Sequence, residues 1–188
     1  MLSNRTDVNI GARLRALRQD SGISIRTLAT RTDFSPSFIS QVEKGQASPS
    51  IASLERLARA LGVSLVEFFA VKEESPTIVT RADRAPELRS TWSRAQIQAL
   101  GPGGGRARLE PLLVTLEPGG LSGKHPSNAA SDTFAFIVEG EVTITVGESQ
   151  HTLRRGDAIT LTVDMPHRWE NTGLLPAQIL VVSARSPR

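Results

Sequence analysis

The chain of 188 residues contains no cysteine and no tyrosine, and aromatic residues make up only 4% of it. The lack of cysteine excludes disulfide bonds, thiolate metal sites and a cysteine nucleophile. No apolar stretch approaches the length of a membrane span, and residues 1–10 have no apolar core of signal-peptide length. We therefore expect a soluble, cytoplasmic protein that makes no contact with a membrane.

The chain also has little net charge, but the charge that it has is unevenly distributed. The formal net charge is +3, and residues 1–70 account for all of it with nine Lys/Arg against six Asp/Glu. The rest of the chain holds 13 residues of each sign. A basic N-terminal part is what a nucleic-acid-binding domain needs. A mildly basic solvated surface would give the same count.

Signals for helices fill the first seventy residues. Ser24, Ser35 and Ser50 stand where N-cap residues are expected, and Ser64 with Glu67 forms a capping box. Apolar residues recur at helical spacing between these positions, and glycines follow at the expected helix ends. The pattern predicts five short helices in an all-α domain over residues 1–70. Residues 71–76, which are charged and end in proline, are expected to form a linker.

Beyond the linker the apolar period becomes that of β-strands. Short alternating or apolar runs end at Gly, Pro or Asp residues that favour turns. Such a pattern is typical of a β-sandwich or barrel and predicts an all-β domain over residues 77–188. The predicted strands cover residues 112–116, 134–138, 142–146, 159–163 and 178–183.

The helical domain carries several known motifs in register, at residues 13–18, 22–24, 35–45 (SPSFISQVEKG), 49–50 and 57–63. With these motifs, residues 10–69 resemble the helix-turn-helix domain of the phage-repressor-like XRE family. The resemblance implies that the helix opening at Ser35 enters the major groove of DNA. It also implies that Arg18 and Glu43 form a structural ion pair between the first and third helices.

The same resemblance places Pro36, Ser37 and Gln41 at base-reading positions. The amide of Gln41 suits an adenine edge, while Lys44, beyond the helix end, suits a phosphate. Taken alone, Gln41 would be read as a solvated surface residue and Ser35 as a helix cap. The predicted DNA-binding residues are Ser24, Arg26, Ser35, Pro36, Ser37, Ser40, Gln41 and Lys44.

One position departs from the family pattern. The second helix of these regulators often begins with a glutamine that touches a phosphate, and this chain has Ile25 there. Phosphate anchoring is then expected from Arg26 or from backbone N–H groups at the helix start. Simple packing of Ile25 between helices is an equal alternative.

In the second domain, the segments 118–120, 134–147 (FAFIVEGEVTITVG), 156–158, 166–167 and 171–173 stand at the spacing of a known fold. With them, residues 105–183 resemble the cupin domain, a double-stranded β-helix with a jelly-roll-like barrel around a central pocket. Trp169 lies two positions after His167 on an expected strand, and hence on the same face. The alternative role for Trp169 is core packing. The candidate pocket residues are Arg108, His125, Asp132, His167 and Trp169.

The first cupin motif is incomplete. Metal-binding cupins carry two histidines one residue apart and then a glutamate, whereas this chain has His125 followed by Pro-Ser-Asn, and Thr133 at the glutamate position. His125, Asp132 and His167 would supply three ligands only if the intervening loop bends suitably. We therefore expect a polar pocket without a metal or other cofactor, and a surface position for His151.

The two resemblances together predict a transcriptional regulator that binds operator DNA and is controlled by a small-molecule effector. A single helix-turn-helix reads few bases, so a homodimer on an inverted-repeat operator is expected. The alternatives are a metal-dependent cupin enzyme with an appended DNA-binding domain and a non-sensing antitoxin. An antitoxin more often carries a short tail than a whole barrel.

Overall fold

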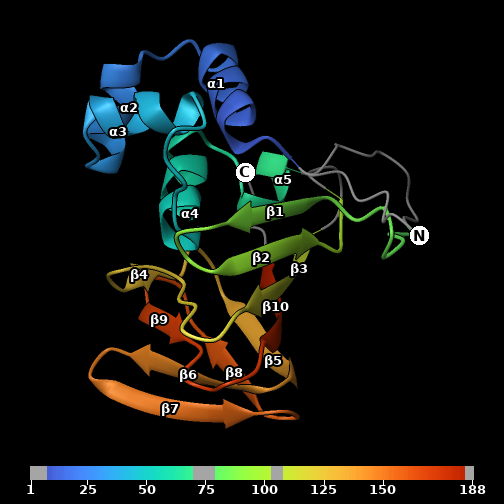
Figure 1. Cartoon of the computed structure of the whole chain (residues 1–188). Coiled ribbons are helices and arrows are strands. Elements are labelled where there is room, and N and C mark those ends of the chain that lie inside the picture. The colour runs from blue at the N-terminus through green and yellow to red at the C-terminus, as the bar shows by residue number, and fades with distance from the viewer. Residues whose placement is uncertain (1–7, 70–78, 103–107, 185–188) are drawn as a thin grey trace.

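A computed structural model describes residues 8–69, 79–102 and 108–184. A helical part and a part made of two β-sheets lie against each other (Figure 1). The predicted linker over residues 71–76 and most of the glycine-rich stretch 101–105 lie outside the described residues. Within the described ranges, no helix is long and apolar enough to cross a membrane. The helices are α1 (Ile10–Asp20), α2 (Ile25–Thr32), α3 (Pro36–Glu43), α4 (Ile51–Ala60) and α5 (Leu65–Phe69).

The helix starts follow the predicted capping residues. The hydroxyls of Ser24, Ser35 and Ser50 each accept a hydrogen bond from the backbone N–H three residues on, at 3.0–3.1 Å. The capping box of α5 is reciprocal, with Ser64 N–H donating to Glu67 at 3.0 Å and Glu67 N–H donating to Ser64 at 3.1 Å. These bonds satisfy N–H groups that have no partner within the helix, and so they fix where each helix begins.

Close contact between α1 and α3 depends on a glycine. A Cβ added to Gly11 would lie 2.5 Å from the carbonyl oxygen of Val42 and 2.7 Å from that of Glu43. Around this contact, the apolar faces of the helices form a dense core that includes the fully buried Leu14, Ile39 and Leu54. Burial of this core stabilises the helical part mainly through removal of apolar surface from water.

The second part consists of two antiparallel sheets that face each other. One has six strands in the order β1-β2-β3-β10-β5-β8, and the other has four in the order β4-β9-β6-β7. The expected jelly-roll-like layering is present, but the predicted barrel is not closed, because hydrogen bonding leaves two separate sheets with edges. The strands are β1 (Glu87–Ser90), β2 (Ala95–Ala99), β3 (Leu109–Leu116), β4 (Ser127–Asn128), β5 (Thr133–Glu139), β6 (Glu141–Val146), β7 (Ser149–Arg154), β8 (Ala158–Leu161), β9 (Pro166–Glu170) and β10 (Ala177–Ala184).

The helical part is joined to the sheets by hydrogen bonds at the start of α4. The Ser90 hydroxyl donates to the carbonyl of Pro49 at 2.6 Å, and the Ala52 N–H donates to the carbonyl of Ser122 at 3.0 Å. The Ile51 N–H donates to the Ser93 hydroxyl at 3.3 Å. Because these bonds involve backbone groups, they hold α4 in a defined position over the sheets.

Candidate functional sites

The first candidate site is the face of α3 that points away from the protein. Ser35, Pro36, Ser37 and Gln41 are exposed, and Ser40 is half-buried. Two residues on the opposite side of the helix, Ile39 and Val42, are buried in the helical core. Helix α3 lies at the end of the molecule remote from the sheets (Figure 1), so its exposed side is free to enter a groove of DNA.

Several basic residues of the helical part are engaged within the protein. Arg13 donates from Nε to the carbonyl of Phe68 at 2.6 Å and so caps the C-terminal end of α5. Arg56 donates to the carbonyl of Thr32 at 2.6 Å and stacks on Phe34, with Cζ 4.3 Å from the ring centroid. The guanidinium groups of Arg13 and Arg56 therefore stabilise the helical part. The exposed basic residues of the helices and their C-terminal ends are Arg15, Arg26, Arg31, Lys44, Arg56 and Arg59, and of these Arg56 and Arg59 also donate hydrogen bonds to backbone carbonyls of the protein.

Arg18 and Glu43 form a two-point ion pair between α1 and the end of α3. Arg18 Nε donates to Glu43 Oε1 at 2.6 Å and Nη2 donates to Oε2 at 3.1 Å, while Nη1 donates to the carbonyl of Ile23 at 3.0 Å. The two side chains are only 12% and 6% exposed. The pair raises the pKa of Arg18 through its hydrogen bond with Glu43, and it fixes the orientation of α3.

At the start of α2, two neighbouring residues differ in their surroundings, since one packs against the core and the other is exposed. Ile25 is half-buried and packs against the hydrophobic core, as one of the two sequence interpretations held. The neighbouring Arg26 is exposed, and the hydroxyl of Ser24 caps the helix and also shares a hydrogen bond with Thr27 Oγ1 at 2.9 Å. Arg26 and the N–H groups of this helix start are thus the groups here that can meet a phosphate.

The second candidate site is a cavity of about 170 Å³ enclosed by both parts of the molecule. Its walls are Leu112 and Val114 of β3, Ile179 and Val181 of β10, and Trp169 of β9. Helices α4 and α5 and the turn between them complete it with Ile51, Glu55, Arg59, Val63, Ser64, Leu65 and Val66.

Strand β9 places two predicted residues, His167 and Trp169, in the wall of this cavity. They lie on one face, as the strand spacing predicts. Burial lowers the pKa of His167, against the opposing effect of its backbone hydrogen bond with Met165. In the neutral ring Nδ1 donates to the carbonyl of Met165 at 3.1 Å, and Nε2 then carries the lone pair that accepts a hydrogen bond.

Two carboxyl groups that the sequence analysis did not single out also line the cavity. Burial raises the pKa of Glu110, and a hydrogen bond with Ser64 opposes that rise. Burial raises the pKa of Glu55 to about 7, although the charge of Arg59 favours ionisation. A sequence signal for Glu55 exists, because it stands four residues after the buried Ile51 on the apolar face of α4.

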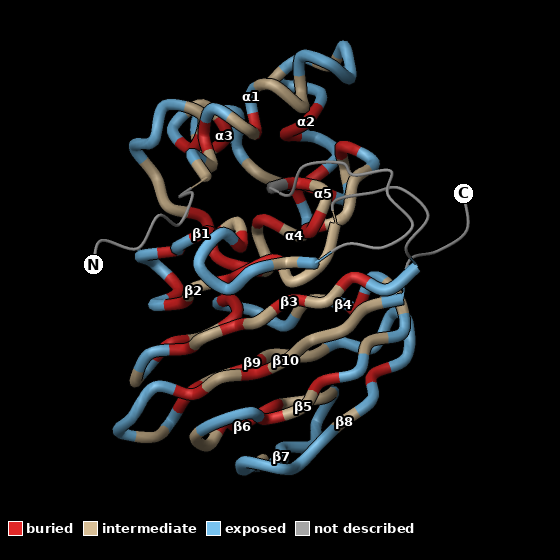
Figure 2. Tube along the Cα trace, turned by 90° about the vertical axis from the view of Figure 1, so that its right-hand side faces the viewer, coloured by how far each residue is buried: buried red, intermediate tan, exposed pale blue. Residues whose placement is uncertain are grey.

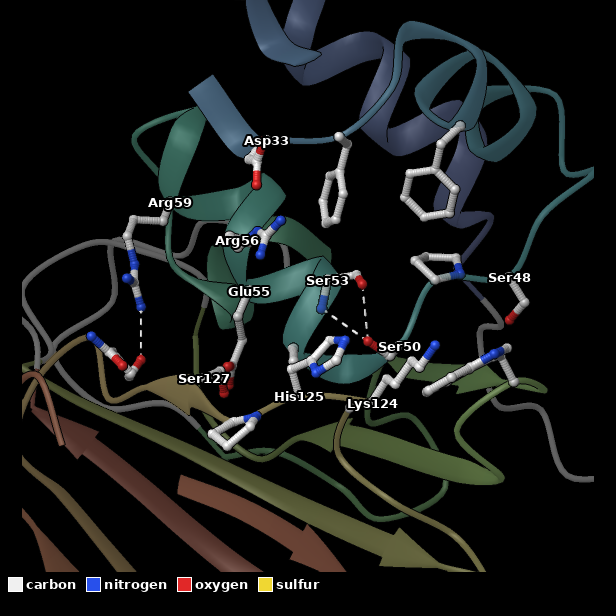
Figure 3. Close-up of a pocket in the computed structure, with 18 residues that line it drawn as sticks. Asp33, Ser48, Ser50, Ser53, Glu55, Arg56, Arg59, Lys124, His125 and Ser127 are labelled. Carbon is white, nitrogen blue, oxygen red and sulfur yellow. Dashed lines mark hydrogen bonds between the residues drawn. The ribbon is translucent and has the colours of Figure 1, made fainter. Parts of the chain in front are cut away.

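An open groove of about 520 Å³ lies on the other side of Glu55, between the helices and the loop over residues 123–128. Figure 3 shows the Glu55 side chain extending from α4 toward Ser127, and Arg59 donating to the carbonyl of Asn128 at 3.0 Å. Glu55, Arg59 and Ser127 line both the groove and the cavity. The groove and the cavity therefore share this wall.

Comparison with known proteins agrees with both halves of this architecture. A family model described as a helix-turn-helix domain matches residues 9–68, and one described as a cupin domain matches residues 112–183. The HTH-type transcriptional regulator y4dJ of Sinorhizobium fredii is 34% identical over 67 residues, which cover 36% of this chain and 87% of that protein. The chain belongs to the XRE-type helix-turn-helix regulators with a cupin domain.

Other relatives of this XRE–cupin regulator match along almost its whole length. The HTH-type transcriptional regulator PuuR of Escherichia coli is 28% identical over 179 residues, 94% of each chain. A crystal structure of an HTH_3 family transcriptional regulator from Vibrio cholerae shares the fold, with a TM-score of 0.72, 24% identity and 96% of each chain covered. The regulator thus combines a DNA-binding domain and a cupin domain in the same order as its relatives.

Three of the predicted pocket residues, Arg108, His125 and Asp132, do not line this cavity. Arg108 is exposed, and so is Asp132, whose Oδ1 accepts a hydrogen bond from Val163 N–H at 3.1 Å. His125 is exposed and lines the groove, because the loop over residues 123–128 turns toward α4 and away from the space between the sheets.

The positions of His125, Asp132 and His167 also decide whether these residues could hold the metal that many cupins bind. Of the predicted trio, only His167 lines the cavity, and no three His, Cys, Asp or Glu side chains in the described ranges come together as a possible metal site. The residues of this regulator therefore do not fit the usual cupin metal. His151, on β7, is exposed as expected.

Proposed function

We propose that this XRE–cupin regulator reads operator DNA through α3 and responds to a small-molecule effector bound in the cavity. The position of that cavity carries the proposal, since its walls come from α4, α5 and the two sheets, and a molecule inside it touches all of them at once. An effector controls a regulator only if it binds two arrangements with different affinity. Because the effector contacts both the helices and the sheets, its affinity changes whenever α4 and α5 shift relative to the sheets.

The cavity limits the size and chemistry of the effector. At about 170 Å³ the cavity has room for a small organic molecule rather than for a single water. The apolar walls on β3 and β10 suit a hydrocarbon portion. His167 Nε2, the hydroxyls of Ser122 and Thr133, and the carboxyl of Glu55 suit a group that donates hydrogen bonds.

The proposed role is binding without catalysis. Cupin oxygenases and isomerases depend on a metal as Lewis acid, and the side chains that line this cavity do not form such a metal site. The chain also contains neither cysteine nor tyrosine to act as a nucleophile or acid. His167 and Trp169 are then effector-binding residues, with the imidazole as an acceptor and the indole as an apolar wall.

On the DNA side, two copies of α3 related by a two-fold axis would read an inverted-repeat operator. Gln41 contacts a base, Ser37 and Ser40 contact bases or phosphates, and Lys44 and Arg26 neutralise phosphates. Pro36 and the cap residue Ser35 bring the helix start close to the groove. The exposure of this face, opposite the buried Ile39, supports these roles.

Footprinting on the region upstream of the regulator's own gene tests the DNA-reading roles. We expect Gln41→Ala to relax specificity at one base position by about 1–3 kcal/mol. Lys44→Ala should weaken binding to all sequences and lower the salt dependence by about one phosphate contact. Gln150→Ala, on the exposed face of β7, is the control and should leave the footprint unchanged. Intact footprints with both α3 variants would refute this reading face.

The effector role is tested by thermal-shift screening with pools of amino acids, amines and small carboxylates, followed by operator binding. A hit should change operator affinity about 5- to 150-fold. Val181→Phe fills the cavity and should abolish the thermal shift and the change in affinity while DNA binding remains. Val163→Phe, at an exposed position outside the cavity, is the control. A saturating hit that leaves operator affinity unchanged contradicts the proposal.

A further inference from the structure

The open groove beside the cavity has walls from both parts of the molecule. The turn between α2 and α3 contributes Phe34, and α4 contributes Arg56. The part made of sheets contributes Trp92 and the loop over residues 123–128. The volume of about 520 Å³ falls within the range of roughly 300–1,000 Å³ that is common for small-molecule sites. A molecule seated here would contact the helices and the sheets together without entering the cavity.

Three aromatic side chains line the groove without being fully buried. Phe34 and Phe38 are half-buried, and their rings pack at a tilt of 58° with centroids 5.0 Å apart. Trp92, in the turn between β1 and β2, is 48% exposed. Aromatic side chains that gather in a hollow among polar residues are typical of a binding site, because a ligand that covers them removes apolar surface from water. The groove is therefore suited to a flat aromatic group.

The basic side chains of the groove have donors that the protein itself does not use. The guanidinium of Arg56 stacks on Phe34 and donates to the carbonyl of Thr32 from Nη2. Since a guanidinium has five N–H donors, others remain for a ligand. Lys124 lies on the opposite wall (Figure 3), is exposed, and makes no hydrogen bond or ion pair with the residues that the structure describes. Both groups can therefore meet an anion.

The two acidic residues of the groove do not cancel this positive charge. Figure 3 shows Asp33 at the end of the groove away from Lys124. Glu55 carries only part of a negative charge at neutral pH, because burial raises its pKa to about 7. Arg59, which also lines the groove, adds a further positive charge to that of Arg56. The balance favours a ligand with one negative charge.

We propose that this groove is a second ligand site of the regulator and that its ligand is a small aromatic carboxylate. The carboxylate accepts hydrogen bonds from Arg56 and Lys124, and the ring lies against Phe38 and Trp92. The effector cavity has the opposite preference, because carboxyl groups and the imidazole of His167 offer acceptors there. The two sites thus select ligands of different charge, and the groove site does not depend on the proposed function.

Isothermal titration calorimetry of the full chain with phenylacetate tests the site. We expect one ligand per chain and a dissociation constant of about 1 mM or lower, as is usual for a molecule of this size. Cyclohexylacetate keeps the carboxylate but lacks the aromatic ring, and benzylamine keeps the ring but carries a positive charge. Each of these two compounds should bind at least about 10-fold more weakly than phenylacetate.

Two variants at exposed positions remove one feature each. Lys124→Gln removes a positive charge and Trp92→Ala removes a ring, and each should weaken phenylacetate binding about 3- to 10-fold. The matched controls are Arg155→Gln and Leu174→Ala, both at exposed positions outside the groove, and they should bind as the parent does. Arg155 follows β7, an exposed strand at the end of the molecule remote from the helices (Figure 2). Circular dichroism checks that each variant is folded.

The cavity-filling variant Val181→Phe locates the bound molecule, because it should leave phenylacetate binding unchanged. Loss of binding in Val181→Phe, with normal binding in Lys124→Gln and Trp92→Ala, would place the ligand in the cavity and overturn the groove site. No binding of phenylacetate, or equal binding of either comparison compound, would also overturn it. Because the titration contains no DNA and no cavity effector, such a failure leaves the proposed function standing, and a failure to bind operator DNA leaves the groove site standing.

Discussion

Replacing Glu55 with glutamine should make the regulator more stable above neutral pH. Burial raises the pKa of this carboxyl from 4.5 to about 7, in spite of the nearby charge of Arg59. Between these values the folded chain binds a proton more tightly than the unfolded chain does. The stability that Glu55 contributes is therefore fully present below about pH 4.5 and is lost as the pH rises through about 7.

The size of the effect follows from the shift. A difference of one pKa unit corresponds to about 1.4 kcal/mol, so a rise from 4.5 to about 7 corresponds to at most about 3.5 kcal/mol. The side chain is half-buried and lines the open groove, and solvent screening there reduces this upper limit. Glutamine keeps the shape of the side chain but cannot ionise. Glu55→Gln should thus match the parent near pH 4 and exceed it by about 1–3 kcal/mol at pH 8.

Urea unfolding followed by circular dichroism at pH 4, 5, 6, 7 and 8 measures this difference. Glu148→Gln, which changes an exposed carboxylate in a turn, serves as the control and should give a difference that varies little with pH. If Glu55→Gln gives a flat curve, burial does not govern the protonation of Glu55. If the variant is less stable than the parent at pH 8, the attraction of Arg59 outweighs burial, and the reasoning fails.

Two further predictions concern the contacts that hold α3 in place. Glu43→Gln leaves the nearly buried Arg18 guanidinium without its carboxylate and should lower the free energy of unfolding in urea by about 3 kcal/mol. The double variant Arg18→Met/Glu43→Leu should lose less stability, because no charge is left buried without a partner. Equal losses for the two variants would mean that the charge pairing is unimportant. Gly11→Ala should destabilise the helical part, because overpacking against the carbonyl of Val42 costs about 1–3 kcal/mol while alanine gains at most about 1 kcal/mol in helix propensity. A rise in melting temperature for Gly11→Ala would contradict the close approach of α1 to α3.

The sequence predicted the local features well, because their causes are local. A serine before a helix satisfies N–H groups within three residues, so Ser24, Ser35 and Ser50 mark real helix starts. Alternation likewise identified β6, and apolar runs identified the C-terminal part of β3 and most of β5 and β10. Strands β1 and β2 were missed, since ELRS and AQIQA are short and half polar. Strand β8 ends at Leu161, two residues earlier than the alternating run suggested.

The pocket was only partly predictable, because it depends on contacts between distant segments. His167 and Trp169 could be paired from strand spacing alone. The position of His125 depends on the path of the loop after β3, and an incomplete motif does not define that path. The contribution of α4 to the cavity depends on how the two domains dock, which no periodicity encodes. Glu55, a carboxyl on an apolar helix face, was the single local clue to that docking.

The way α4 is held suggests how the effector acts. Its N-terminal end is tied to the sheets through hydrogen bonds of the helix backbone, Ala52–Ser122 and Ile51–Ser93. Its C-terminal end and the turn to α5 meet the sheets through side chains, with the Arg59–Asn128 and Ser64–Glu110 hydrogen bonds and the apolar side chains of Val63 and Val66 at the cavity. Apolar contacts adjust to a small shift more readily than buried backbone hydrogen bonds, which lose a partner when they break. We therefore infer that an effector displaces the α5 end while the start of α4 stays fixed. Since α5 is also bound to α1 through Arg13, and α1 to α3 through Arg18, such a displacement would reach α3, the helix that we propose reads DNA, by direct contacts.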